Sequence, residues 1–217
     1  MKFPNAHNGV KKLFIAEIIT VITGLLFVVA AVFGILGLKN DGLLLTAGTL
    51  ILVSGIALIV AFVFQLVGLV QGGRDSEQIK FALWATLVGI ILSVISSILS
   101  RWTDKFAIDL TKTLVDAGVT IAQLFATYYV LLGISGLAKQ LGDSVMEQKG
   151  IFLGKCVIYL FVASTLLSIL ATALSKVQAE WLQVTLGLVA LVASIINLVV
   201  YILTVLYYAK AVKMLKK

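Results

Sequence analysis

The sequence has very few of the residues that build metal sites, disulfides and catalytic centres. It contains one cysteine, one histidine and one proline among 217 residues, together with only 10 acidic residues. Cys156 has no partner for a disulfide, and His7 has no cysteine or carboxylate cluster beside it. The catalytic motifs HExxH and GxSxG are absent from the sequence. We therefore expect no enzyme activity, no metal and no cofactor.

Charge is scarce as well. Charged residues make up 12% of the chain, whereas a soluble domain carries about 25%. Hydrophobic residues make up 61%, and the mean hydropathy is +1.13. So few polar groups cannot cover a surface that faces water. The composition predicts an all-α integral membrane protein whose first partner is the lipid bilayer.

Long apolar runs fill most of the chain. A membrane-spanning helix needs about 20 apolar residues. Six segments qualify, and we predict six transmembrane helices at roughly 13–38, 43–71, 81–100, 117–138, 150–175 and 182–209. Residues 1–12 are a short polar segment that contains Pro4. The first apolar run is too long for the core of a signal peptide, so we expect it to be retained. Little chain remains outside these runs, and we treat residues 1–217 as a single transmembrane domain.

The net charge of +7 is distributed as in a membrane protein, and we expect no nucleic-acid partner. With the N-terminus inside, the larger set of basic residues is cytoplasmic and the smaller set lies opposite. This asymmetry follows the positive-inside rule and predicts a multi-pass protein of the cell (inner or plasma) membrane with both termini in the cytoplasm. The cytoplasmic set is Lys2, Lys11, Lys12, Arg74, Lys80, Lys139, Lys149, Lys210, Lys213, Lys216 and Lys217. The opposite set is Lys39, Arg101, Lys105, Lys112 and Lys176.

The sequence contains a pattern that is typical of an internal repeat. Two segments are similar: residues 61–81, AFVFQLVGLVQGGRDSEQIKF, and residues 129–152, YVLLGISGLAKQLGDSVMEQKGIF. Residues 205–217 are similar to the part of the second segment where its first helix ends. This pattern predicts three parallel helical-hairpin repeats of about 70 residues, at about 7–74, 75–142 and 143–217. The alternative is that any two apolar helices joined by a polar turn look alike. A threefold array of hairpins is similar in outline to the mitochondrial carriers, but their proline-and-charge signature is absent here.

Residues 101–116, RWTDKFAIDLTKTLVD, form the longest polar stretch between two spans. Aromatic and aliphatic residues recur at helical spacing, with Asp and Lys between them. Two interpretations stay open. The stretch forms a short amphipathic helix on the membrane surface, or the third or fourth helix extends out of the bilayer.

Two embedded charges form the first candidate site. When the hairpins are aligned on Phe14, Phe81 and Phe152, the position three residues later holds Glu17, Trp84 and Lys155. An ion inside a membrane can be stabilised by an opposite charge, so Glu17 and Lys155 are a candidate intramembrane pair. Alternatively, Lys155 extends to the headgroups and Glu17 reaches water from its shallow position.

Polar side chains at helical spacing form the second candidate site. The candidate polar path consists of Asn197, Ser194, Tyr201, Thr204 and Gln123. These side chains either line a route for a solute or make hydrogen bonds between and within helices. The second span also carries Ala47, Gly48 and Gly55, small residues that let neighbouring helices approach closely.

Three classes of function are considered, and the missing motifs argue against an enzyme. Large apolar faces, little embedded charge and small loops favour a non-catalytic membrane subunit that acts as a scaffold, an anchor or a stabiliser of a complex. Such a subunit implies a protein partner or further copies of this chain. The alternative is a small-solute or ion transporter or channel with a polar path near Asn197 and Glu17. Parallel repeats and spans without proline do not match the inverted repeats common in secondary transporters.

Overall fold

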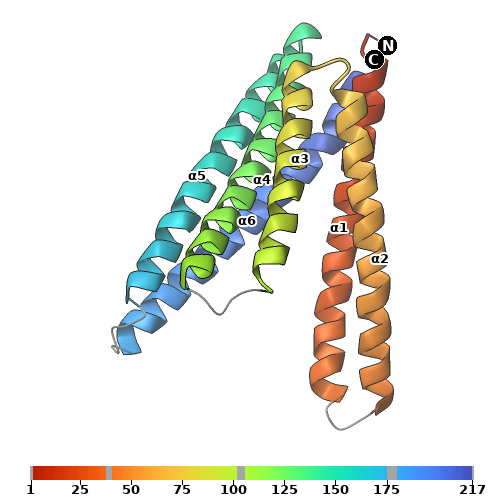
Figure 1. Cartoon of the computed structure of the whole chain (residues 1–217). Coiled ribbons are helices and arrows are strands. Elements are labelled where there is room, and N and C mark those ends of the chain that lie inside the picture. Colours follow the sequence, from red (N-terminus) through yellow and green to blue (C-terminus); the bar gives the residue numbers. More distant parts are fainter. Residues whose placement is uncertain (1, 38–40, 102–105, 175–179, 217) are drawn as a thin grey trace. The chain divides into compact units, whose positions relative to one another are not determined.

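The computed structural model describes residues 2–37, 41–101, 106–174 and 180–216. Within these ranges the chain forms six α-helices joined by short connections (Figure 1). They are α1 (Pro4–Leu36), α2 (Asp41–Gly72), α3 (Glu77–Leu99), α4 (Phe106–Gln140), α5 (Ser144–Leu174) and α6 (Glu180–Leu215). All six are long and apolar enough to cross a membrane. The prediction of an all-α protein with six candidate spans is confirmed.

Several helices extend beyond the predicted apolar runs. At 1.5 Å per residue, the 33 residues of α1 extend about 50 Å, more than the roughly 30 Å of a hydrocarbon core. Most of the polar segment 1–12 is helical, because α1 begins at Pro4. Proline suits this first helical position, where its missing N–H is not needed. For the polar stretch 101–116, the structure agrees with the alternative in which the fourth helix is extended. From Phe106 onward it is the first part of α4, and residues 102–105 lie outside the described ranges.

The helices fall into two compact units, which are described separately. The first contains residues 1–75 and 208–217, and the second contains residues 76–207. The last turns of α6 therefore belong to the first unit and the rest of α6 to the second. Neither the repeat nor the single predicted domain is tested by this division, and both stay predictions.

The first unit is built on the antiparallel α1–α2 hairpin (Figure 1). The two backbones come closest where Gly9 faces Gly68 and Gly72. A Cβ atom on Gly9 would lie 2.5 Å from the amide nitrogen of Gly72 and 2.6 Å from the carbonyl oxygen of Gly68. Helices in membranes approach this closely only where side chains are absent. Of the small residues in α2 that the sequence singled out, Ala47 is buried, whereas a Cβ atom on Gly48 or Gly55 would have no neighbour within 4 Å.

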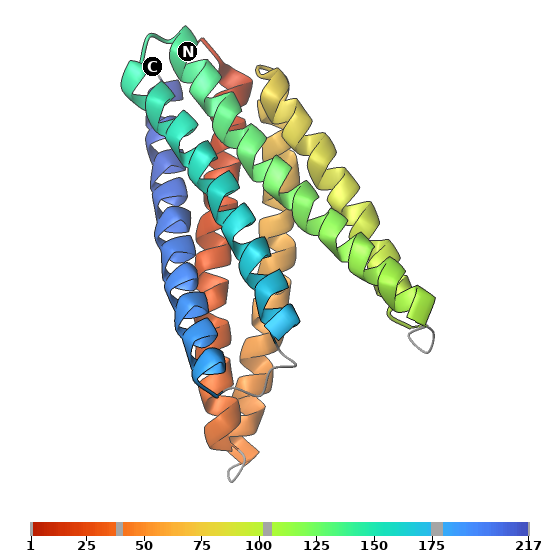
Figure 2. The same ribbon diagram turned by 90° about the vertical axis from the view of Figure 1, so that its left-hand side faces the viewer.

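The second unit packs α3 against α4 and α4 against α5 (Figure 2). The contact between α3 and α4 is closest at Gly133, where a Cβ atom would lie 2.5 Å from Cγ1 of Ile79 and 2.9 Å from the Ser76 hydroxyl. Ile79 is fully buried. Farther along the same helices, a Cβ atom on Gly89 would lie 3.4 Å from Cβ of Ala122, and one on Gly118 would lie 3.1 Å from Cδ1 of Leu92.

The two polar turns that suggested the repeat have different local structures. After α2, the amides of Gly73, Arg74 and Asp75 bond to the carbonyls of Leu69, Gln71 and Gly72, and Ser76 then caps α3 by accepting a bond from the Ile79 amide. After α4, Gly142 adopts a φ of 75°, and the amides of Gly142 and Asp143 bond to the carbonyls of Lys139 and Ala138. This is a Schellman motif, which requires a left-handed residue and so favours glycine.

Buried side chains concentrate at one end of each unit. In the first unit they lie near the start of α1 and the ends of α2 and α6. In the second unit they lie at the start of α3, the end of α4 and the start of α5. The fully or nearly fully buried large side chains of this kind are Val10, Leu69, Ile79, Leu131, Ile134, Leu137 and Leu215. The distant halves of the helices carry exposed aliphatic side chains instead, as lipid-facing or partner-facing surface does.

Candidate functional site

The two candidate charged residues lie on different helices and in different units. Glu17 is half-buried in α1, and Lys155 is exposed on α5. Glu17 makes an interaction of its own, so it is not an isolated buried charge. The pairing of Glu17 with Lys155 stays a prediction.

Most hydroxyl groups in the spans bond to their own helix. In the candidate polar path, Ser194 donates to the Ala190 carbonyl and Thr204 to the Val200 carbonyl, both at 2.9 Å. The same pattern from residue i to i−4 occurs in other helices, for example from Thr86 to Ala82 at 2.9 Å. Such bonds satisfy a hydroxyl group without a neighbouring helix or water.

The remaining members of the polar path have different surroundings. Gln123 is exposed on α4, Tyr201 is half-buried on α6, and Thr204 is buried with 6% of its surface exposed. Asn197 is exposed and lies well inside the candidate span Gly187–Leu215. In the described part of the chain, the Asn197 carboxamide has no hydrogen-bond partner. The polar path stays a prediction.

Sequence reasoning missed a hydrogen-bond network at the chain ends of the first unit. The Asp75 carboxylate accepts bonds from the Asn5 side-chain amide at 3.0 Å and from the Ala6 backbone amide at 2.8 Å. Nδ1 of His7 lies 3.1 Å from the carbonyl oxygen of Val212 in α6. The network joins the start of α1 to the turn after α2 and to the last turns of α6. No local motif could have shown it, because the partners are far apart in sequence.

A second network fixes the first turns of α5 in the second unit. The Ser135 hydroxyl donates to the Glu147 carbonyl at 2.9 Å, and the Tyr207 hydroxyl donates to the Met146 carbonyl at 3.2 Å. Gly150 makes room for this arrangement, since a Cβ atom there would clash with the Tyr207 hydroxyl and lie 2.8 Å from Cβ of Ser135. These polar groups stabilise helix ends and are not available to a ligand.

Two open grooves lie on helix surfaces. One, with a volume of about 640 Å³, is apolar apart from Thr49 and is lined by Leu44, Leu45, Gly48, Thr49 and Leu52 of α2. The other, of about 280 Å³, lies on α3 and is lined by Glu77, Lys80, Phe81 and Trp84. Neither groove includes a member of the candidate polar path. The sequence could have indicated the second groove, because Lys80, Phe81 and Trp84 follow Glu77 by three, four and seven residues, a spacing that places side chains on one face of a helix.

Aromatic rings of α4 support the groove on α3. The rings of Phe81 and Tyr129 are 5.8 Å apart between centroids, and those of Phe125 and Tyr129 are 6.1 Å apart. Tyr128 packs edge-on against Tyr129 at 5.7 Å. Aromatic clusters of this kind are typical of the membrane–water interface, and this one holds one wall of the groove in place.

No group of three or more His, Cys, Asp or Glu side chains that could hold a metal ion occurs among the described residues. Cys156 is a half-buried free thiol on α5. Comparison of the chain with models of protein families, with curated proteins and with solved structures gave no match.

Proposed function

We propose that this protein is a non-catalytic subunit of a membrane complex, which it joins through contacts between helices inside the bilayer. The observation that supports this most directly is the Asn197 carboxamide, exposed inside a candidate span and without a partner among the residues described. An unsatisfied amide in an apolar medium costs on the order of 2–7 kcal/mol. A polar side chain of a neighbouring subunit would remove that cost.

The hydroxyl groups near Asn197 differ from its carboxamide in how they are satisfied. Ser194 lies about one turn before Asn197 and is also exposed, yet its proton is already donated to the Ala190 carbonyl. An Asn side chain cannot satisfy both its donors and its acceptors in this way and commonly bonds across helices. Asn197 is therefore the residue on this face of α6 that gains most from a partner chain.

The apolar surface of α1 and α2 offers ample area for such a partner. Large aliphatic side chains on both helices are more than half exposed along their middle and distal portions. Those more than 60% exposed are Leu25, Val28, Ile35, Leu45, Leu52 and Ile59. Lipid can cover this surface as well, so it permits a partner and does not by itself require one.

We further propose a bacterial inner membrane or another plasma membrane as the location, with both ends of the chain in the cytoplasm. The bond between His7 and Val212 brings the start of α1 and the end of α6 to one end of the first unit. Basic residues flank both: Lys11 and Lys12 on α1, and Lys210 and Lys213 on α6. A cysteine-accessibility measurement on each terminus in intact cells tests this orientation.

The deciding experiment is purification of the tagged protein at native expression in a mild detergent, followed by native mass determination. We expect a stoichiometric second protein or a defined homo-oligomer. Asn197→Leu should lower the bound fraction several-fold, because an interhelical hydrogen bond in membranes is worth about 0.6–2 kcal/mol. Ser194→Ala is the matched control on the same helix face and should leave the complex intact.

A lone monomer with unchanged behaviour of Asn197→Leu would contradict the proposal. Flux assays on the reconstituted protein would then test the alternative of solute or ion permeation. In that case Glu17, Lys155 and Asn197 would be substituted first.

A further inference from the structure

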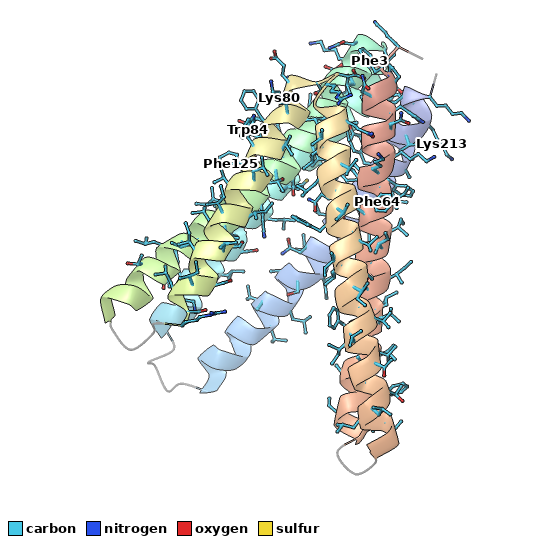
Figure 3. All side chains as sticks on the ribbon, turned by 45° about the vertical axis from the view of Figure 1, so that its right-hand side comes forward. Phe3, Phe64, Lys80, Trp84, Phe125 and Lys213 are labelled. Atoms are coloured by element: carbon cyan, nitrogen blue, oxygen red, sulfur yellow. The ribbon has the colours of Figure 1, made fainter. Side chains whose placement is uncertain are left out.

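The groove on α3 places two opposite charges and two aromatic rings on one helix face. Glu77, Lys80, Phe81 and Trp84 line a volume of about 280 Å³, and their spacing puts them on neighbouring turns of the same side. Lys80 and Trp84 project from the same side of α3 (Figure 3). Phe81 and Trp84 are each 58% exposed, so the groove is open to the surroundings of the helix.

The two charged side chains in this groove have no counter-charge in the described part of the chain. Neither Glu77 nor Lys80 forms an ion pair with any residue that the structure describes. In the predicted repeat the position of Glu77 corresponds to Glu147, which does have a counter-charge: its carboxylate lies 3.9 Å from the Lys139 ammonium. An unpaired anion and cation in one groove complement a ligand that carries both charges.

The order of the groups along α3 matches the order of groups in a phospholipid. The candidate span begins at Glu77, so Glu77 is outermost. Lys80 lies about 4.5 Å deeper along the axis, and Trp84 about 6 Å beyond Lys80, at 1.5 Å per residue. Deeper still, exposed aliphatic side chains continue on this part of the helix at Val88 and Ile91. From water inward, a phosphatidylethanolamine presents an ammonium, a phosphate, a glycerol ester and an acyl chain.

We propose that this groove is a binding site for a phosphatidylethanolamine-type lipid of the bilayer. The Glu77 carboxylate accepts hydrogen bonds from the primary ammonium group, and the Lys80 ammonium donates to the phosphate. Phe81, held by Tyr129, and Trp84 flank the glycerol region, and one acyl chain lies along Val88 and Ile91. The proposal rests on α3 crossing the membrane and is independent of the proposed function as a subunit.

The same geometry predicts which lipids bind less well. A choline headgroup has no N–H donor for Glu77, and the Trp84 ring lies on the acyl side of Lys80, away from the position of a choline. Phosphatidylglycerol retains the phosphate but has no cation for Glu77, so the carboxylate repels it. Selectivity should therefore depend on Glu77, and binding of all three lipids on Lys80.

The test is a lipid titration of the full-length protein followed by native mass spectrometry. The probes are phosphatidylethanolamine, phosphatidylcholine and phosphatidylglycerol with identical acyl chains. For the first bound lipid we expect phosphatidylethanolamine to bind about tenfold more tightly than phosphatidylcholine, since loss of one charge-assisted bond is worth about a factor of ten or more. Lys80→Gln should weaken all three lipids, and Lys149→Gln, an exposed lysine outside the groove, is the charge-matched control.

Glu77→Gln tests the lipid preference directly. It should abolish the preference for phosphatidylethanolamine over phosphatidylcholine and increase binding of phosphatidylglycerol, and a general loss of folding cannot strengthen the binding of one lipid. Equal affinity of the wild type for the three lipids would overturn the proposal. So would equal effects of Lys80→Gln and Lys149→Gln.

Discussion

The carboxylate of Asp75 accepts a hydrogen bond at 2.8 Å from the backbone amide of Ala6, a residue 69 positions earlier in the chain. A second bond at 3.0 Å comes from the side chain of Asn5. The first amides of a helix have no partner within the helix, and Asp75 supplies one from the far end of the α1–α2 hairpin. A turn residue of one helix thereby acts as the N-terminal cap of another, and its negative charge also suits the positive end of the helix dipole.

The first prediction concerns this cap. Asp75→Ala should destabilise the protein by about 1–2 kcal/mol, the range of lost N-caps, and lower the midpoint of thermal unfolding in detergent. Arg74→Ala is the control, because Arg74 is an exposed neighbour in the same turn and surface changes usually stay within about 0.5 kcal/mol. Equal midpoints for the two variants would show that the cap contributes nothing.

The second prediction concerns the close contact between α1 and α2. Gly9→Ala introduces a Cβ atom 2.5 Å from the Gly72 nitrogen, so the two backbones must separate. We expect a loss of about 1–3 kcal/mol, as for overpacking of a tight core. Gly24→Ala, on the same helix with no neighbour within 4 Å, should be neutral or slightly stabilising because alanine favours helix. A destabilised Gly24→Ala variant would mean that the loss at Gly9 reflects any added methyl group.

The third prediction concerns the network at the start of α5. Tyr207→Phe removes the hydroxyl that donates to the Met146 carbonyl and should cost about 1 kcal/mol, the net value of one hydrogen bond. The ring stays buried, so packing is retained. Tyr159→Phe is the control, since Tyr159 is 69% exposed. Chemical denaturation in mixed micelles measures both, and indistinguishable curves would rule out a stabilising role for the hydroxyl.

The fourth prediction concerns the candidate charge pair. Glu17→Lys alone should lower the yield of folded protein, because it places two cations at the proposed pairing depth. Combining it with Lys155→Glu should restore the yield. The readout is the monodisperse fraction by size-exclusion chromatography with a fluorescent fusion. If the double variant remains as poor as the single one, Glu17 and Lys155 do not pair.

Hydropathy was enough to locate the six helices but not their ends. The six apolar runs predicted six helices, because burial in lipid needs only length and apolar composition. The start of α1 at Pro4 escaped prediction because its cap, Asp75, comes from another part of the chain. The start of α4 at Phe106 stayed one of two open alternatives, because Asp109, Lys112 and Asp116 fit a separate surface helix as well as an extension of the fourth helix.

The sequence also did not predict which glycines make the close contact between helices. Gly48 and Gly55 interrupt a run of large side chains in the sequence, and this pattern is typical of a close contact between helices. Gly9 and Gly68 make the close contact instead, because the register of the hairpin brings them together near the turn after α2. A sequence shows where small residues are, and only the pairing of two helices decides which of them meet.

The bond between His7 and Val212 has a consequence for synthesis in the cell. Residues 208–217 belong to the first unit yet leave the ribosome after every other residue described here. The second unit is therefore fully translated first, while the face of α1 around Ala6 and Val10 waits for its last contacts. A chain without residues 208–217 would lack the end of the sixth predicted span and the Val212 carbonyl that contacts His7, so this face would be incomplete. Cellular quality control would then have a structural basis for recognising a chain that lacks residues 208–217.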